Sequence, residues 1–176
     1  MASLPDETRR QVQWHPPVSY LPRPILEPRN VAAAVLVGWL TALIPSLLLS
    51  AVVNKLLPHV ATPDLKIQGA ATFSLVVVIS PIIETCIMGG VLALLLRFVP
   101  PTAAVLLSAL AWGIAHSVAA PAWGLVIWWP FVVFSTLFVT WRQRSLALAL
   151  VVPACAHALQ NLLPSLILLS GIKSPV

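Results

Sequence analysis

The sequence contains few charged residues. Asp, Glu, Lys and Arg together make up 9% of the 176 residues, whereas apolar residues make up 59%, and the mean hydropathy is +0.96. Soluble domains carry about 25% charged residues, so this chain lacks the charge to cover a surface that faces water. The basic residues are scattered and mostly flank apolar runs, rather than forming a patch that would bind nucleic acid. We therefore predict an integral membrane protein whose surroundings are a lipid bilayer, with no nucleic-acid partner.

Cysteine is also scarce, and the chain begins without a signal peptide. Cys86 and Cys155 both lie within apolar runs, where a free cysteine behaves as a small hydrophobic residue, so we expect no disulfide. Residues 1–30 hold charges and several prolines but no apolar stretch of the kind that signal peptides contain. We interpret 1–30 as a polar, proline-rich tail that either lies on the membrane surface or a partner, or is loosely ordered.

Long apolar runs are what the sequence does contain. Five follow the tail, at about 31–53 (interrupted by Pro45), 69–98, 102–119, 121–140 and 145–170. Each is close to or above the roughly 20 residues that an α-helix needs to cross a hydrocarbon core. Membrane β-strands are shorter and alternate in polarity. The predicted fold class is therefore all-α, a polytopic membrane helical bundle with about five transmembrane helices that occupies residues 31–176.

The basic residues also predict an orientation. If the N-terminus lies inside, seven arginines fall in inner segments and three lysines fall in outer segments. Because cytoplasmic loops are enriched in Lys and Arg, we expect the N-terminus in the cytoplasm and the C-terminus outside.

Three ionisable residues interrupt the predicted spans, each in a different helix: Glu84, His116 and His157. Intramembrane charges are costly and usually face a bundle interior or a water-filled cavity, and Glu84 and His157 fall near the middle of their spans. Asn161 follows His157 by four residues and so projects from the same helix face. We predict that these four side chains converge on one polar site.

The chemistry that this set supports best is the activation of water. A carboxylate in an apolar cavity becomes a stronger base, one histidine can hold the water, and the other histidine with Asn161 can stabilise an oxyanion. Histidine and glutamate are also zinc ligands, but the spacing is not HExxH and each residue comes from a separate helix, so we expect no metal and no cofactor. A purely structural set of hydrogen bonds between helices is the plainer alternative.

Three motifs surround these residues: PIIETCIMGG (81–90), SALAWGIAH (108–116) and PACAHALQN (153–161). In order and spacing they resemble the CPBP intramembrane proteases, which include type II CAAX prenyl endopeptidases and bacteriocin-processing proteins. The resemblance implies a four-helix protease-like core at about 69–170 and a glutamate-type endopeptidase without a catalytic metal, in which Glu84 activates water and His116, His157 and Asn161 complete the site. The expected substrate is a peptide or a membrane-anchored protein, and the expected location is a bacterial inner (cytoplasmic) membrane.

The first motif departs from the family pattern at two positions. Thr85 stands where the family has a second glutamate, and Gly89 stands where it has an arginine. These positions have the i, i+4 spacing of a helical ion pair, and losing both partners costs far less than losing one. We expect Thr85 to line the substrate cavity together with Trp112, which replaces a phenylalanine of the second motif.

Three hypotheses about function follow. The first is an active intramembrane endopeptidase. The second is a catalytically inactive, protease-like membrane protein that acts as a binding, assembly or regulatory subunit, which the loss of the charged pair favours. A small transporter or channel component is the third, but few polar residues are available to line a pathway.

Overall fold

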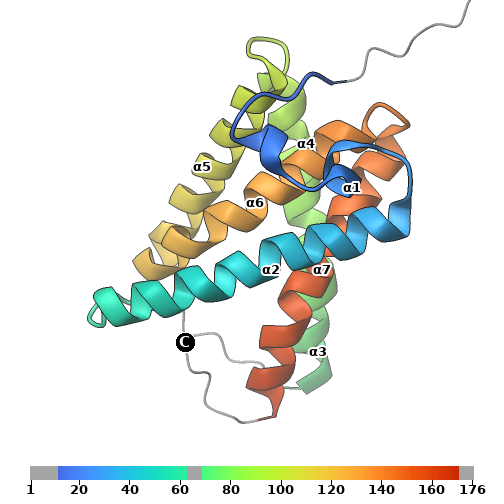
Figure 1. Ribbon diagram of the computed structural model, residues 1–176. Coiled ribbons are helices and arrows are strands. Elements are labelled where there is room, and N and C mark those ends of the chain that lie inside the picture. The colour runs from blue at the N-terminus through green and yellow to red at the C-terminus, as the bar shows by residue number, and fades with distance from the viewer. Residues whose placement is uncertain (1–11, 63–68, 171–176) are drawn as a thin grey trace, which may run out of the picture.

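The computed structural model is a bundle of helices (Figure 1) and describes residues 12–62 and 69–170. The elements, in chain order, are η1 (Val18–Tyr20), α1 (Arg23–Leu26), α2 (Val31–Leu56), α3 (Gly69–Ser74), η2 (Leu75–Ile79), α4 (Ser80–Leu95), α5 (Pro101–Ala119), α6 (Pro121–Trp141) and α7 (Leu146–Leu169). Five helical segments are long and apolar enough to cross a membrane: α2, the run from α3 to α4, α5, α6 and α7. No strand occurs in the described ranges. The predicted all-α membrane bundle is therefore confirmed.

The helices begin where the sequence supplies local start signals. The side chain of Asn30 accepts a hydrogen bond from the Ala33 N–H at 3.0 Å and caps α2, and Ser145 caps α7 through the Leu148 N–H at 3.1 Å. The observed bounds of the spans lie within a few residues of the predicted ones. The predicted interruption at Pro45 is absent, because α2 continues through it, as membrane helices often do when neighbouring helices support the backbone.

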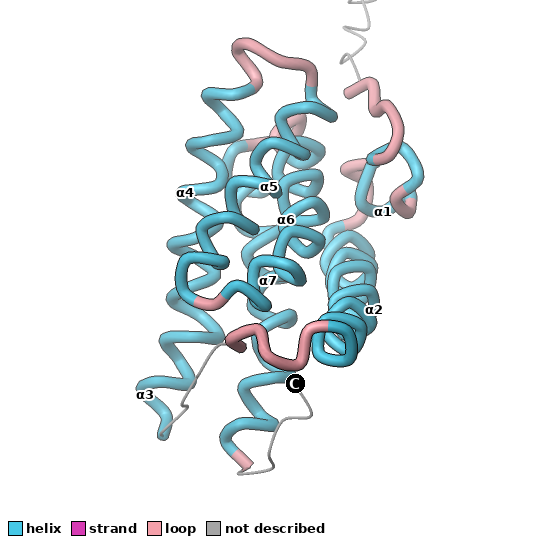
Figure 2. Tube along the Cα trace, turned by 90° about the vertical axis from the view of Figure 1, so that its left-hand side faces the viewer, coloured by secondary structure: helices cyan, strands magenta, loops and turns pink. Residues whose placement is uncertain are grey.

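Helix α6 is the centre of the bundle, with α4 on one side and α2 on the other (Figure 2). In α6, 67% of the most apolar stretch is buried, against 28–33% in the other four spans. Its side chains Phe131, Phe134 and Phe138 are at most 2% exposed. The other spans pack one face inward and present leucine, isoleucine and valine outward, which is the surface that a bilayer solvates. The core is thus built around an aromatic helix.

The described part of the N-terminal segment packs on one end of the bundle. Val18 and Ile25 are 1% and 0% exposed and belong to the main hydrophobic core. The backbone N–H of His15 donates a 3.0 Å hydrogen bond to the hydroxyl of Thr102 at the start of α5. The sequence predicted a tail for residues 1–30, and residues 1–11 lie outside the described ranges. Residues 12–30 form part of the folded end of the bundle, since their apolar side chains find partners there.

Candidate active site

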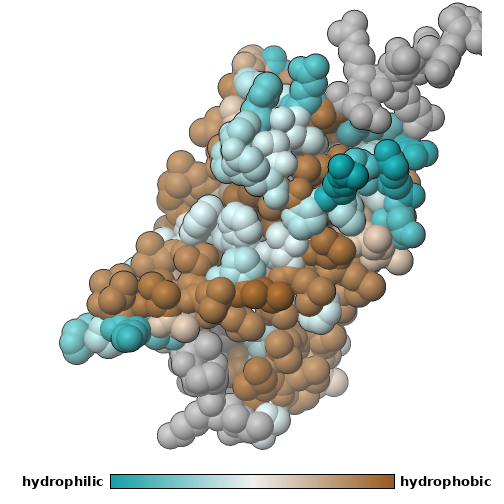
Figure 3. Space-filling model, in the orientation of Figure 1, coloured by the Kyte–Doolittle hydropathy of each residue, from teal (hydrophilic) through white to brown (hydrophobic). Residues whose placement is uncertain are grey.

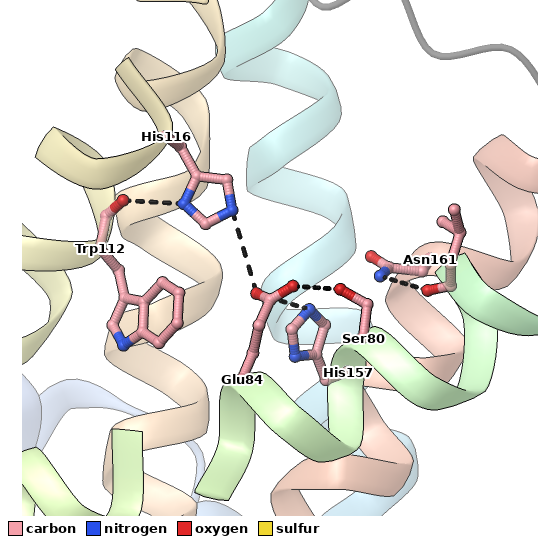
Figure 4. A network of polar contacts seen from close by, with 7 residues as sticks. Ser80, Glu84, Trp112, His116, His157 and Asn161 are labelled. Atoms are coloured by element: carbon pink, nitrogen blue, oxygen red, sulfur yellow. Dashed lines mark hydrogen bonds and ion pairs between the residues drawn. The ribbon is translucent and has the colours of Figure 1, made fainter. Parts of the chain in front are cut away.

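Glu84 lies near the middle of the α3–α4 span, between α5 and α7 (Figure 4). Its carboxylate oxygen Oε2 lies 3.9 Å from Nε2 of His116 and 3.9 Å from Nε2 of His157. The Glu84 side chain is 20% exposed, against 13% for His116 and 7% for His157. Three ionisable side chains from three different helices therefore meet at one partly enclosed point inside the bundle.

Ser80 holds the other oxygen of the same carboxylate. It lies one helical turn before Glu84, and its hydroxyl donates a 2.5 Å hydrogen bond to Oε1. This contact fixes the carboxylate so that Oε2 faces the two histidines. Ser80 is absent from the set of predicted site residues, although its i, i+4 spacing from Glu84 would have indicated the contact.

His116 is oriented by the backbone of its own helix. Its Nδ1 lies 2.8 Å from the carbonyl oxygen of Trp112, and because a carbonyl only accepts hydrogen bonds, Nδ1 carries the proton. In a neutral imidazole the other nitrogen, Nε2, then holds a lone pair. Two acceptors, this lone pair and Oε2 of Glu84, thus face each other across 3.9 Å. Such a distance exceeds a direct hydrogen bond and suits two groups that bind the same water molecule.

His157 is the most buried member of the set, and aromatic rings fix its orientation. The ring of Phe134 stacks on it with centroids 4.8 Å apart, and Phe131 meets it edge-on at 5.5 Å. Its Nδ1 is buried and has no hydrogen-bond partner in the part of the chain that the structure describes. Its Nε2 lies 3.9 Å from Oε2 of Glu84, so this side of the ring faces the carboxylate.

Asn161 lies on α7 one turn after His157, but its amide bonds to the backbone of the α3–α4 span. In the π-helical turn η2, the N–H of Ser80 donates to the carbonyl of Leu75, five residues earlier. The next donor along the chain is missing because residue 81 is proline. The carbonyl of Val76 thereby loses its π-helical donor and accepts a 3.0 Å hydrogen bond from the Asn161 side chain instead.

The structure therefore separates the four predicted catalytic residues into two groups. His116 and His157 each lie 3.9 Å from Glu84, whereas Asn161 forms no hydrogen bond to any of the three within the described ranges. The signal that would have predicted the second contact is Pro81, which removes a backbone donor one turn beyond Val76. Asn161 joins α7 to η2, the turn that directly precedes α4 (Figure 4).

An aromatic wall encloses the histidine side of the site. Trp112 stacks on Phe131 with ring centroids 4.5 Å apart and an interplanar angle of 7°. Trp123 meets the ring of His116 edge-on at 4.7 Å. Trp112 thus lies beside the site, and Phe131 and Trp123 add to it from α6. Neither is among the predicted residues, because no polar motif on α6 points to them.

Thr85 and Gly89 lie on the buried face of α4, and Glu84 lies beside that face. Thr85 is 2% exposed, and its hydroxyl has no hydrogen-bond partner among the described residues. A Cβ on Gly89 would lie 2.6 Å from Cε2 of Phe138 and 3.4 Å from a methyl group of Leu150. The sequence predicted a cavity position for Thr85. The structure buries it on the same helix face as Gly89, which packs against α6 and α7.

The donor set of the site bears on metal binding. Histidine and carboxylate side chains are zinc ligands in other proteins. In the described ranges, however, no group of three or more His, Cys, Asp or Glu residues has an arrangement that could hold a metal ion. The arrangement of Glu84, His116 and His157 suits acid–base chemistry on a water molecule.

Residues 66–163 match the protein family described as type II CAAX prenyl endopeptidase Rce1-like. The match covers more than half of the chain and contains every residue of the polar site. No curated protein and no solved structure matches the chain.

Proposed function

Because the chain belongs to the type II CAAX prenyl endopeptidase Rce1-like family, a family of membrane proteases, we propose that it is an intramembrane endopeptidase of the glutamate type. The substrate is a peptide or a membrane-anchored protein. The observation that carries the proposal is the position of Glu84 Oε2, which lies 3.9 Å from Nε2 of both His116 and His157 inside the bundle.

A purely structural role fits this geometry less well. Side chains that only join helices form direct hydrogen bonds, at about 2.7–3.2 Å for N–H donors. Here Oε2 of Glu84 and Nδ1 of His157 are buried without a partner among the described residues, and each such group costs about 1–3 kcal/mol. Unsatisfied buried polar groups of this kind need an explanation, and a reacting water that binds Oε2 supplies one for Glu84.

In the proposed reaction, a water molecule binds between Glu84 and the histidines. Oε2 of Glu84 accepts one proton of the water while the water oxygen attacks the carbon of the scissile peptide carbonyl. Nε2 of His116 accepts a hydrogen bond from the second O–H and so orients the nucleophile. Ser80 keeps Oε1 occupied, which leaves Oε2 as the basic atom.

Attack breaks the carbonyl π bond and leaves a negative charge on its oxygen. His157 donates from Nε2 to this oxyanion. Asn161 retains a second amide N–H beyond the one that binds Val76, and we assign it to the same oxyanion. The proton on Glu84 then passes to the leaving nitrogen as the C–N bond breaks. The products are an amine and a carboxylic acid that keeps the second proton of the water, and Glu84 is again ionised. The acid then loses this proton to the released amine.

The proposed setting is a bacterial inner membrane with the N-terminus in the cytoplasm. Among the described residues, arginines lie in α1, beside the start of α2, and in the α4–α5 and α6–α7 loops, which share one end of the bundle (Figure 1). The far end of α2 carries Lys55. A surplus of basic residues favours the cytoplasmic side, so this orientation follows from the distribution.

Replacement of Glu84 by glutamine tests the proposal directly. Glutamine keeps the shape of the side chain but cannot accept the proton, so we expect cleavage to fall about 10²–10⁴-fold. The measurement is mass spectrometry of membrane-associated peptides from cells that express the native chain or the variant. Glu27→Gln is the matched control, because Glu27 lies outside the polar site and pairs with the exposed Arg29. A peptide profile that Glu84→Gln leaves unchanged would overturn the proposal.

The packing around Gly89 favours a second candidate, a protease-like subunit without catalytic activity. The family's charged pair is missing there, and Phe138 lies where the side chain of an arginine would begin. Such a protein would act by holding a partner. It would retain a stoichiometric partner through purification, and Glu84→Gln would alter neither that partner nor the peptide profile.

A further inference from the structure

A partly open cavity of about 520 Å³ lies between the N-terminal segment and the loop that joins α6 to α7. It shares no residue with the polar site around Glu84. Its polar lining includes Arg29, Gln143 and Arg144, and its apolar lining includes Trp14 and Leu26. None of these residues has a part in the proposed reaction, so the cavity requires a separate explanation.

Within the described ranges, each of the two arginines uses only its Nε–H donor. Nε of Arg29 pairs with the carboxylate of Glu27 at 2.8 Å, and Nε of Arg144 donates to the carbonyl of Pro28 at 3.1 Å. The terminal guanidinium nitrogens of both side chains have no partner in the described part of the chain. Among the described residues, Glu27 is the one carboxylate that lines the cavity, so within these ranges one of the two positive charges has no counterion. Paired guanidinium groups of this kind match the oxygens of a phosphate.

Trp14 supplies an independent observation. Its indole N–H is buried and has no acceptor among the residues that the structure describes, although a buried indole N–H usually finds one. It lines the same cavity as the arginines. An anionic ligand with several oxygens would satisfy this donor together with the guanidinium groups.

The position of the cavity indicates where such a ligand would come from. The cavity lies where α2 begins, α6 ends and α7 begins, which is the level at which a bilayer places its phosphate groups. Hydrophilic residues gather over α1 at this end, above the hydrophobic belt along α2 (Figure 3). Leu26 and Val12 give the cavity an apolar side. A ligand with an anionic head and an apolar body therefore fits better than a free anion.

We propose that this cavity is a binding site for the phosphate group of an anionic phospholipid. Arg29 and Arg144 bind the phosphate oxygens, Trp14 donates its indole N–H, and the glycerol and acyl chains lie along the apolar side. Anionic lipids are concentrated in the cytoplasmic leaflet and attract basic residues near the membrane ends of helices.

The test compares lipids on the full chain in detergent. Addition of phosphatidylglycerol should raise the thermal unfolding midpoint by roughly 5–10 °C at 100 times its Kd, relative to the same amount of phosphatidylcholine. Arg144→Gln and Arg29→Gln should each abolish most of this difference. Arg142→Gln is the matched control, because Arg142 lies in the same loop but does not line the cavity, and it should retain the full difference.

Three results would overturn the proposal. One is an equal loss in Arg142→Gln and Arg144→Gln, which would indicate general attraction to basic residues. Another is an equal effect of the two lipids on the native chain. The third is a full shift with inorganic phosphate alone, which would indicate a free anion as the ligand. If Arg144→Gln fails to fold without its bond to Pro28, Arg29→Gln decides, since the Arg29 side chain is 78% exposed.

Discussion

The two neighbouring faces of α4 differ in what they contact. One carries Glu84, which is held by Ser80 and faces two histidines at 3.9 Å. The other carries Gly89, which packs against α6 and α7, and Thr85, whose buried hydroxyl has no hydrogen-bond partner among the described residues. The candidate catalytic carboxylate and the positions of the missing ion pair therefore belong to separate environments. Loss of the pair therefore leaves the contacts of Glu84 intact.

The packed face has a simple energetic basis. A buried ion pair must recover the cost of removing two charges from water, and its replacement by well-packed apolar groups is often neutral or stabilising by about 1–4 kcal/mol. Glycine at position 89 lets Phe138 approach the helix backbone closely. The aromatic ring then occupies the space that a longer side chain would need. The two substitutions and the phenylalanine thus form one consistent arrangement.

The largest loss of stability is expected when only the arginine of the family's ion pair is restored. Gly89→Arg puts a guanidinium group against Phe138 with no carboxylate beside it, so we expect a loss of about 3–5 kcal/mol in the free energy of unfolding. Thermal unfolding of the purified protein measures this loss. Adding Thr85→Glu should recover part of it, because the two positions are one helical turn apart. A Gly89→Arg protein as stable as the native chain would show that this face is not tightly packed.

A smaller difference in stability is expected between alanine substitutions at two adjacent glycines. Gly89→Ala brings a methyl group to 2.6 Å from Phe138, and such overpacking costs about 1–3 kcal/mol. Gly90 is its control, since a Cβ there meets nothing within 4 Å. Gly90→Ala should leave stability unchanged or raise it by about 0.5–1 kcal/mol through helix propensity. Equal unfolding midpoints for the two variants would contradict the close packing of position 89 against Phe138.

The smallest effect is expected at Thr85. Valine keeps the shape of threonine and removes a hydroxyl that is buried without a partner in the described ranges, so Thr85→Val should stabilise the protein by up to about 1 kcal/mol. Peptide cleavage in the mass-spectrometric assay should stay unchanged. A loss of cleavage would instead return Thr85 to the substrate cavity, where the sequence predicted it.

Hydropathy along the chain was sufficient to predict the five spans, because each apolar run is bounded by charged residues, prolines or caps. It also placed Glu84, His116 and His157 on three different helices. It could not predict which face of α4 packs inward, because residues all around this helix are apolar and no amphipathic pattern marks a side. The burial of Thr85 could not be predicted for this reason.

Other features depend on contacts between distant parts of the chain. Residues 12–30 fold onto the bundle because Val18 and Ile25 are buried in its core. Few local sequence patterns indicate this burial. The hydrogen bond between Asn161 and Val76 joins residues 85 positions apart. It requires both a π-helical turn and a proline, and neither feature alone specifies the partner.

The π-helical turn has a consequence for the direction of Glu84. Successive residues of an α-helix are rotated by about 100°, and a π turn accommodates one additional residue. The segments before and after η2 are therefore out of phase by about that angle. Relative to α3, Glu84 points to the histidines only because η2 contains this additional residue. The number of residues between positions 69 and 84 therefore determines the direction in which the side chain at position 84 points. This direction matters as much as the presence of a glutamate there.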